Sequence, residues 1–71
     1  MVEQITEYFQ TQKQGEIYRA VIDNTERVLI ETALEQTCGN QISAAKILGL
    51  NRNTLRSKIR RLNINTGRFK Q

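Results

Sequence analysis

Hydrophobic side chains recur every three or four positions at the start of the chain, which is the spacing of one face of an α-helix. Val2, Ile5 and Phe9 form such a stripe. The pattern predicts a first helix over Val2–Gln12. Gly15 is a suitable terminator, because glycine readily adopts the left-handed backbone that ends helices.

A longer amphipathic pattern predicts a second helix over Glu16–Thr37, with Gly39 as its stop. A domain of about 70 residues has a small core and is often stabilised by dimerisation. We therefore expect the apolar faces of the first two helices to pack in the core or against a second copy of the chain. The predicted dimer contacts are Val2, Ile5, Phe9, Ile17, Val21 and Val28.

Two short helices are predicted in the second half of the chain, each opened by an asparagine. Asn40 and Asn51 are strong N-cap candidates, so the helices should cover Gln41–Leu48 and Arg52 to about Arg61. The last helix has its apolar positions at Leu55, Ile59 and Leu62. Residues 63–71 show no period, and we expect a mobile tail there.

The segment Gln41–Leu62 has the form of a helix-turn-helix. Ala45 is small where the two helices must touch, and Gly49 follows four residues later, where a tight turn needs a left-handed backbone. The apolar residues that can join the two helices to the rest are Leu48, Leu50, Leu55 and Ile59. The expected fold is all-α: dimerisation helices over 1–38, a helix-turn-helix unit over 39–62 and a basic tail over 63–71.

Charge separates the two halves of the chain. Residues 1–35 hold three basic and seven acidic side chains, whereas residues 36–71 hold eight basic and no acidic ones. A solvated basic face is the simplest explanation for a few basic residues, but the absence of any carboxylate over the second half weighs against it. In a helix-turn-helix, this charge predicts double-stranded DNA as the partner.

The second helix of a helix-turn-helix enters the major groove. A helical wheel places Asn53, Arg56 and Arg60 on the side opposite the apolar positions. Arg56 is the first choice for a base contact, followed by Arg52 and Asn53, because arginine pairs bidentately with guanine and asparagine with adenine. Thr54 is suited to a phosphate or a thymine methyl group.

Other residues suit the phosphate backbone. Lys58, Arg60 and Arg61 are expected to contact phosphates, and the backbone N–H groups at Asn40 and Gln41 offer a helix N-terminus. Capping alone explains Asn40 and Asn51, with a DNA contact as an additional role. The residues that we assign to the DNA-binding surface are Asn40, Gln41, Asn51, Arg52, Asn53, Thr54, Arg56, Lys58 and Arg60.

The stretch GNQISAAKILGLNRNTLR, from Gly39 to Arg56, resembles the Fis-type helix-turn-helix. It is still more similar to the C-terminal DNA-binding domain of NtrC-type bacterial activators, and of nitrogen regulators in particular. The resemblance covers roughly Glu16–Ile64. It implies a four-helix, Fis-like homodimer whose first two helices intertwine and whose two recognition helices read an inverted repeat. Ser57 and Ile42 depart from the family pattern, which often has lysine and a hydroxyl residue there.

The resemblance implies a module that positions a transcriptional activator, with sigma-54 RNA polymerase contacted through domains absent from this chain. A stand-alone Fis-like protein that bends nucleoid DNA is the alternative, and a module that binds an acidic protein is a third. No enzyme, metal site or cofactor is expected, since the chain lacks histidine and a phosphate-binding loop. The single Cys38, the short apolar runs and the lack of a secretory signal predict a cytoplasmic protein without a membrane partner.

Overall fold

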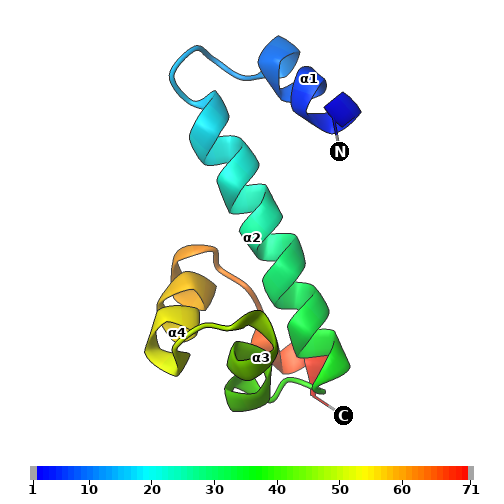
Figure 1. The fold of residues 1–71 in the computed structure, drawn as a ribbon, viewed down its shortest axis with the longest axis vertical. Helices are drawn as coiled ribbons and strands as arrows, with labels where there is room; N and C mark the ends of the chain where they lie inside the picture. Colours follow the sequence, from blue (N-terminus) through cyan, green and yellow to red (C-terminus); the bar gives the residue numbers. More distant parts are fainter. Residues whose placement is uncertain (1, 71) are drawn as a thin grey trace.

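The computed structural model describes residues 2–70, with side chains from residue 4 onward. Every regular element among them is helical, and the ends of the four α-helices lie within one residue of the predicted ones. The all-α prediction is therefore confirmed. In chain order the elements are α1 (Val2–Thr11), α2 (Ile17–Gln36), α3 (Gln41–Leu48), α4 (Arg52–Arg61) and the 3₁₀ helix η1 (Thr66–Phe69) (Figure 1).

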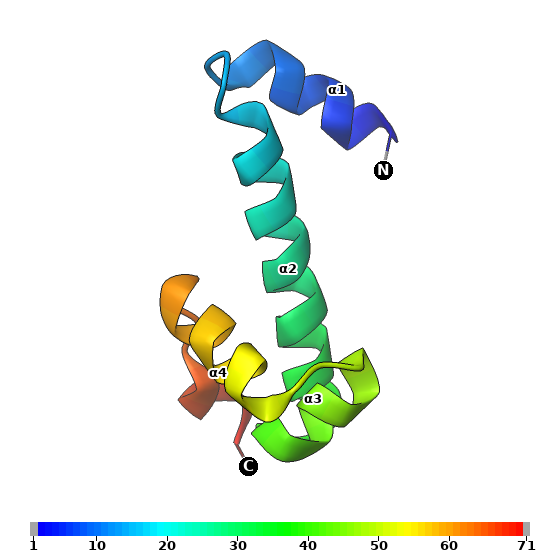
Figure 2. The same ribbon diagram turned by 60° about the vertical axis from the view of Figure 1, so that its left-hand side comes forward.

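The long helix α2 is the axis of the molecule. Figures 1 and 2 show α1 across its N-terminal end, whereas α3, α4 and the C-terminal segment gather around its C-terminal end. The resulting shape is elongated, with extents of 38 × 21 × 20 Å. The two ends of α2 therefore contact different parts of the chain.

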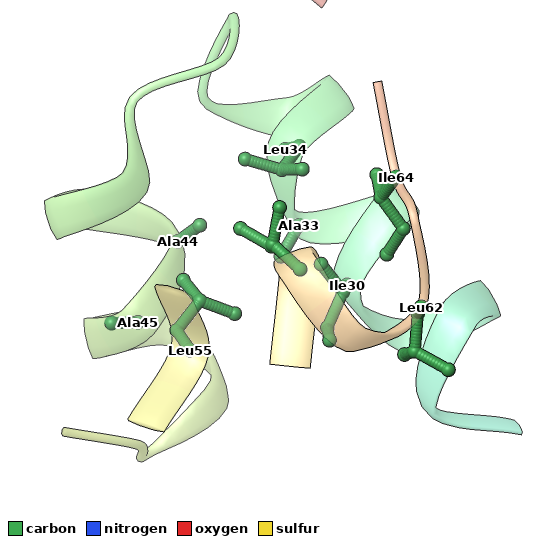
Figure 3. Packing of buried hydrophobic residues seen from close by; sticks show 9 residues of the cluster. Ile30, Ala33, Leu34, Ala44, Ala45, Leu55, Leu62 and Ile64 are labelled. Atoms are coloured by element: carbon green, nitrogen blue, oxygen red, sulfur yellow. The ribbon is translucent and has the colours of Figure 1, made fainter. Parts of the chain in front are cut away.

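The hydrophobic core occupies only the C-terminal end. Its buried residues all lie between Ile30 and Ile64, so none of the described side chains of α1 and of the first half of α2 belongs to it. Ala44 and Ala45 are almost completely buried, because their small side chains let α3 lie close to α2 (Figure 3). The buried cluster consists of Ile30, Ala33, Leu34, Ala44, Ala45, Leu55, Ile59, Leu62 and Ile64.

The segment after α4 does not form the structureless tail that we expected. Ile64 is buried in the core, and Phe69 packs against it from η1. Arg68 pairs with Glu31 of α2 and lies over the Phe69 ring, 4.7 Å from its centroid. The prediction was wrong because two isolated apolar residues give no periodic signal, although each fills a gap in the core.

Three helices end in the same way, through a Schellman motif with one left-handed residue. That residue is Cys38 after α2 (φ 54°), Gly49 after α3 (φ 75°) and Asn63 after α4 (φ 57°). The stop of α2 was expected at Gly39, which is also left-handed, but Cys38 takes this conformation first. The closing backbone bonds are Gly39 N–H to Leu34 O (2.8 Å), Leu50 N–H to Ala45 O (2.9 Å) and Ile64 N–H to Ile59 O (3.0 Å).

Helices α1 and α2 expose apolar side chains outside the core. Phe9 is 65% exposed and Val28 is 54% exposed, while Ile17 and Val21 are half-buried. Of the predicted dimer contacts, only the Val2 side chain lies outside the described part of the chain. Large apolar side chains exposed on α1 and α2 are Ile5, Phe9, Tyr18, Ile22, Val28 and Leu29. No helix in the described range is long and apolar enough to cross a membrane.

Candidate nucleic-acid interface

The helix-turn-helix is built by caps that the sequence supplies locally. The Asn40 side chain accepts a hydrogen bond from the Ser43 N–H (3.1 Å) and opens α3. The Asn51 side chain accepts one from the Asn53 N–H (2.8 Å) and opens α4. Gly49 stands between them in the left-handed conformation and turns the chain. The predicted caps and turn are therefore confirmed.

The orientation of α4 follows from its apolar side. Leu55 is completely buried and Ile59 nearly so, which anchors this side of the helix in the core. Figure 3 shows Leu55 directed toward Ala44 and Ala45 of α3. The remaining side of α4 is therefore presented to solvent. Arg61 is exposed as well but is directed to α2, where it forms ion pairs. The other exposed residues of the helix form what we call the outer face of α4: Arg52, Asn53, Thr54, Arg56, Ser57 and Arg60.

The outer face of α4 is flanked by two shallow depressions. On one side Gln41, at the start of α3, lines a depression together with Arg56 and Arg60. On the other side Asn53 and Thr54 line a second one. Ile59, Asn63 and Ile64 complete the first, and Ser57, Lys58 and Arg61 complete the second. The structure thus brings Gln41 of α3 beside Arg56 and Arg60 of α4, whereas Asn40, Asn51 and Arg52 line neither depression.

The basic half is partly neutralised by the acidic half. Lys58 pairs with Glu26, and Arg61 pairs with Asp23 (2.7 Å) and Glu26 (2.8 Å), all across from α4 to α2. With Arg68 on Glu31, three of the eight basic residues have a carboxylate partner on α2. The sequence alone suggested that they had none. The other five are exposed and form no ion pair with a described residue: Lys46, Arg52, Arg56, Arg60 and Lys70.

This pairing changes the ranking of the predicted phosphate contacts. Lys58 is half-buried against α2, and its ammonium group forms an ion pair with Glu26. Arg60 is exposed and keeps its charge available on the outer face of α4. The hydrogen bond to Asp23, more than the nearby carboxylate charges, raises the pKa of Arg61.

Arg27, which no sequence pattern singled out, holds the C-terminal end of α4. Arg27 of α2 donates from Nη2 to the Leu62 carbonyl oxygen, 2.5 Å away, at the C-terminal end of α4. A cation at this end of a helix is favourable, because the last carbonyl groups carry partial negative charge. No local pattern could have revealed this contact, since the two residues are separated by 35 positions.

The fold and this surface define the chain as a helix-turn-helix protein with a cationic recognition helix. The model of the family described as "Bacterial regulatory protein, Fis family" matches residues 21–62, more than half of the chain. The chain therefore belongs to the Fis family of bacterial regulatory proteins and carries its helix-turn-helix DNA-binding domain. The resemblance inferred from residues 39–56 is confirmed.

Two groups of relatives share this domain. The chain is 50% identical over 64 residues to the DNA-binding transcriptional regulator NtrC of Azospirillum brasilense, which covers 84% of this chain and 13% of that protein. It is 54% identical over 52 residues to NtrC of Rhizobium meliloti (strain 1021), and the match covers 73% of this chain and 11% of that protein. It is 39% identical over 54 residues to the DNA-binding protein Fis of Vibrio atlanticus (strain LGP32), and the match covers 76% of this chain and 55% of that protein. No solved structure matches the chain.

Proposed function

We propose that the chain is the sequence-specific DNA-binding domain of an NtrC-type transcriptional activator and binds an inverted repeat as a homodimer. The observation that carries this proposal is the outer face of α4, where Arg52, Arg56 and Arg60 stand exposed and unpaired with any described carboxylate. In a full-length activator, other domains would contact sigma-54 RNA polymerase in the cytoplasm, while this domain holds the protein on the DNA.

The outer face of α4 divides into base-reading and phosphate-binding positions. Arg56 lies near its centre and is proposed to contact a guanine in the major groove, with Arg52 and Asn53 beside it. Thr54 and Arg60 are proposed to contact phosphates. At the N-terminus of α3, Asn40 and Gln41 can add a further phosphate contact through backbone N–H groups. Asn51 caps α4, and its amide NH₂ remains available for DNA.

The homodimer is supported by the apolar surface at the other end of the molecule. Ile5 and Phe9 of α1 and Val28 of α2 are exposed in the single chain, although they are large and apolar. Phe9 also lines an open apolar depression with Ile17 and Val21. A second copy of the chain would cover this surface through the hydrophobic effect. The two outer faces of α4 would then be held at a fixed spacing.

A stand-alone Fis-like nucleoid protein is the second candidate. The higher identity to NtrC regulators, 50–54% against 39% for Fis, favours the activator. Selection of bound sequences from a random duplex pool separates the two. The activator domain should yield a palindromic site with strong base preferences, whereas a bending protein should yield a degenerate one.

The direct test is Arg56→Ala, compared with Arg19→Ala as a matched loss of one exposed arginine on α2. Arg56→Ala should cost about 1–3 kcal/mol per contact and relax the base preference at one position of each half-site. Arg19→Ala should leave the affinity and the base preference unchanged. With about six phosphate contacts per dimer, log K should fall with log salt with a slope of roughly −5. A monomeric protein without preference for any duplex would refute the proposal.

A further inference from the structure

The ion pairs between α2 and α4 form a compact interhelical cluster of four residues. Asp23 and Glu26 are three positions apart on α2, and Lys58 and Arg61 are three positions apart on α4. Residues with this spacing lie on one face of a helix, so two acidic groups meet two basic groups. Glu26 joins the cluster, since its Oε2 accepts from Lys58 and its Oε1 accepts from Arg61.

Both terminal nitrogen atoms of the Arg61 guanidinium already donate to these carboxylates. Nη1 donates to Asp23 Oδ1 and Nη2 donates to Glu26 Oε1. An end-on bidentate contact to a DNA phosphate also uses Nη1 and Nη2. A phosphate bound in this manner would compete with the α2 carboxylates for Nη1 and Nη2 of Arg61, and a phosphate near Lys58 would compete with Glu26 for its ammonium group.

The cluster borders the proposed DNA-binding surface. Lys58 and Arg61 line the same depression as Asn53, Thr54 and Ser57. The Arg61 side chain is 47% exposed and that of Glu26 is 21% exposed, so solvent and ligands reach the cluster from one side. Partly exposed ion pairs contribute little net stability, which makes their exchange for phosphate contacts inexpensive.

We propose that Asp23 and Glu26 compete internally with DNA phosphates: they hold Lys58 and Arg61 against α2, so that these cations contribute to binding only when DNA displaces the carboxylates. The competition lowers affinity for random DNA, where phosphate contacts dominate binding, more than affinity for the specific site. This inference rests on the proposed function, because it assigns a role to residues at the edge of the same surface.

A double-mutant cycle on a random duplex tests the competition. In the wild-type dimer, Lys58→Ala should change the Kd for this duplex less than twofold, because Lys58 is held by Glu26. In the Glu26→Gln background, the same substitution should weaken binding severalfold. Glu35→Gln is the matched control, since it removes one carboxylate from the same helix at an exposed position that pairs with no described residue.

The salt dependence gives a second readout. If Glu26→Gln frees one cation in each protomer, the slope of log K against log salt should become more negative by about 1.8. An increase from 50 to 200 mM salt should then weaken binding of the variant by roughly twelvefold more than it weakens binding of the wild type. Glu35→Gln should leave the slope near the wild-type value. Circular dichroism must show that each variant remains helical. If Glu26→Gln does not fold, the corresponding double-mutant cycle of Asp23→Asn and Arg61→Ala tests the same competition.

The outcomes are distinct. A loss from Lys58→Ala that is equal in both backgrounds overturns the competition. A Glu26→Gln variant with weaker binding to the selected site and unchanged binding to random DNA also overturns it, because this pattern shows that the cluster only positions α4. A wild-type protein that binds no duplex overturns the proposed function and this inference together.

Discussion

The contact between Arg27 and the end of α4 permits a quantitative test of how the recognition helix is held. Arg27 lies on α2, is half-buried, and donates to the Leu62 carbonyl oxygen at 2.5 Å. Replacing it by methionine keeps much of the side-chain stem but removes the charged donor. Hydrogen bonds to charged groups contribute about 1.5–3 kcal/mol, so Arg27→Met should lower the free energy of unfolding by about this amount.

The matched control is Arg19→Met, which makes the same chemical change at an exposed position of the same helix. Arg19 forms no hydrogen bond or ion pair with a described residue apart from the backbone bonds of α2, so its loss should cost less than about 0.5 kcal/mol. The comparison therefore isolates the contact to Leu62 from the general effect of removing an arginine.

Urea and thermal unfolding followed by circular dichroism measure both variants. For a chain of this size the expected loss corresponds to a fall in Tm of roughly 6–24 °C. Protein concentration must be equal in all samples, because dimerisation makes Tm depend on it. Equal stabilities of Arg27→Met and Arg19→Met would show that the contact does not stabilise the fold, and the account of how α4 is anchored would be wrong.

Three further substitutions test other parts of the fold. Leu55→Ala removes a completely buried side chain and should lower the free energy of unfolding in urea by about 2.7–5 kcal/mol. Ile47→Ala, at a position that is 57% exposed, should lower it by less than about 1 kcal/mol. Similar losses in the two variants would contradict the assigned core. Cys38→Gly should stabilise the chain by about 0.5–1 kcal/mol, because it relieves a left-handed non-glycine residue, and a lower Tm would argue against this strain. Asn51→Ala should cost about 1 kcal/mol through loss of the cap of α4, and Asn51→Ser should recover most of it; failure of serine to do so would show that the cap is not the cause.

The sequence was sufficient to predict the four helices and the outer face of α4. Their signals are local: Asn40 and Asn51 satisfy backbone N–H groups a few residues away, and Gly49 allows the left-handed turn. The spacing of Leu55 and Ile59 fixes which side of α4 enters the core, and therefore which side faces solvent. The roles in DNA binding and dimerisation assigned to single residues remain predictions.

The tertiary structure decided what lies far apart in sequence. It placed Asp23 and Glu26 beside Lys58 and Arg61, which reduced the unpaired positive charge that the sequence had suggested. It also brought Arg27 to the end of α4. The physical reason is that helix periodicity and capping depend on neighbours within about four residues, whereas ion pairs between helices depend on their packing. Local chemistry determines the helices, and only their packing determines which charges meet.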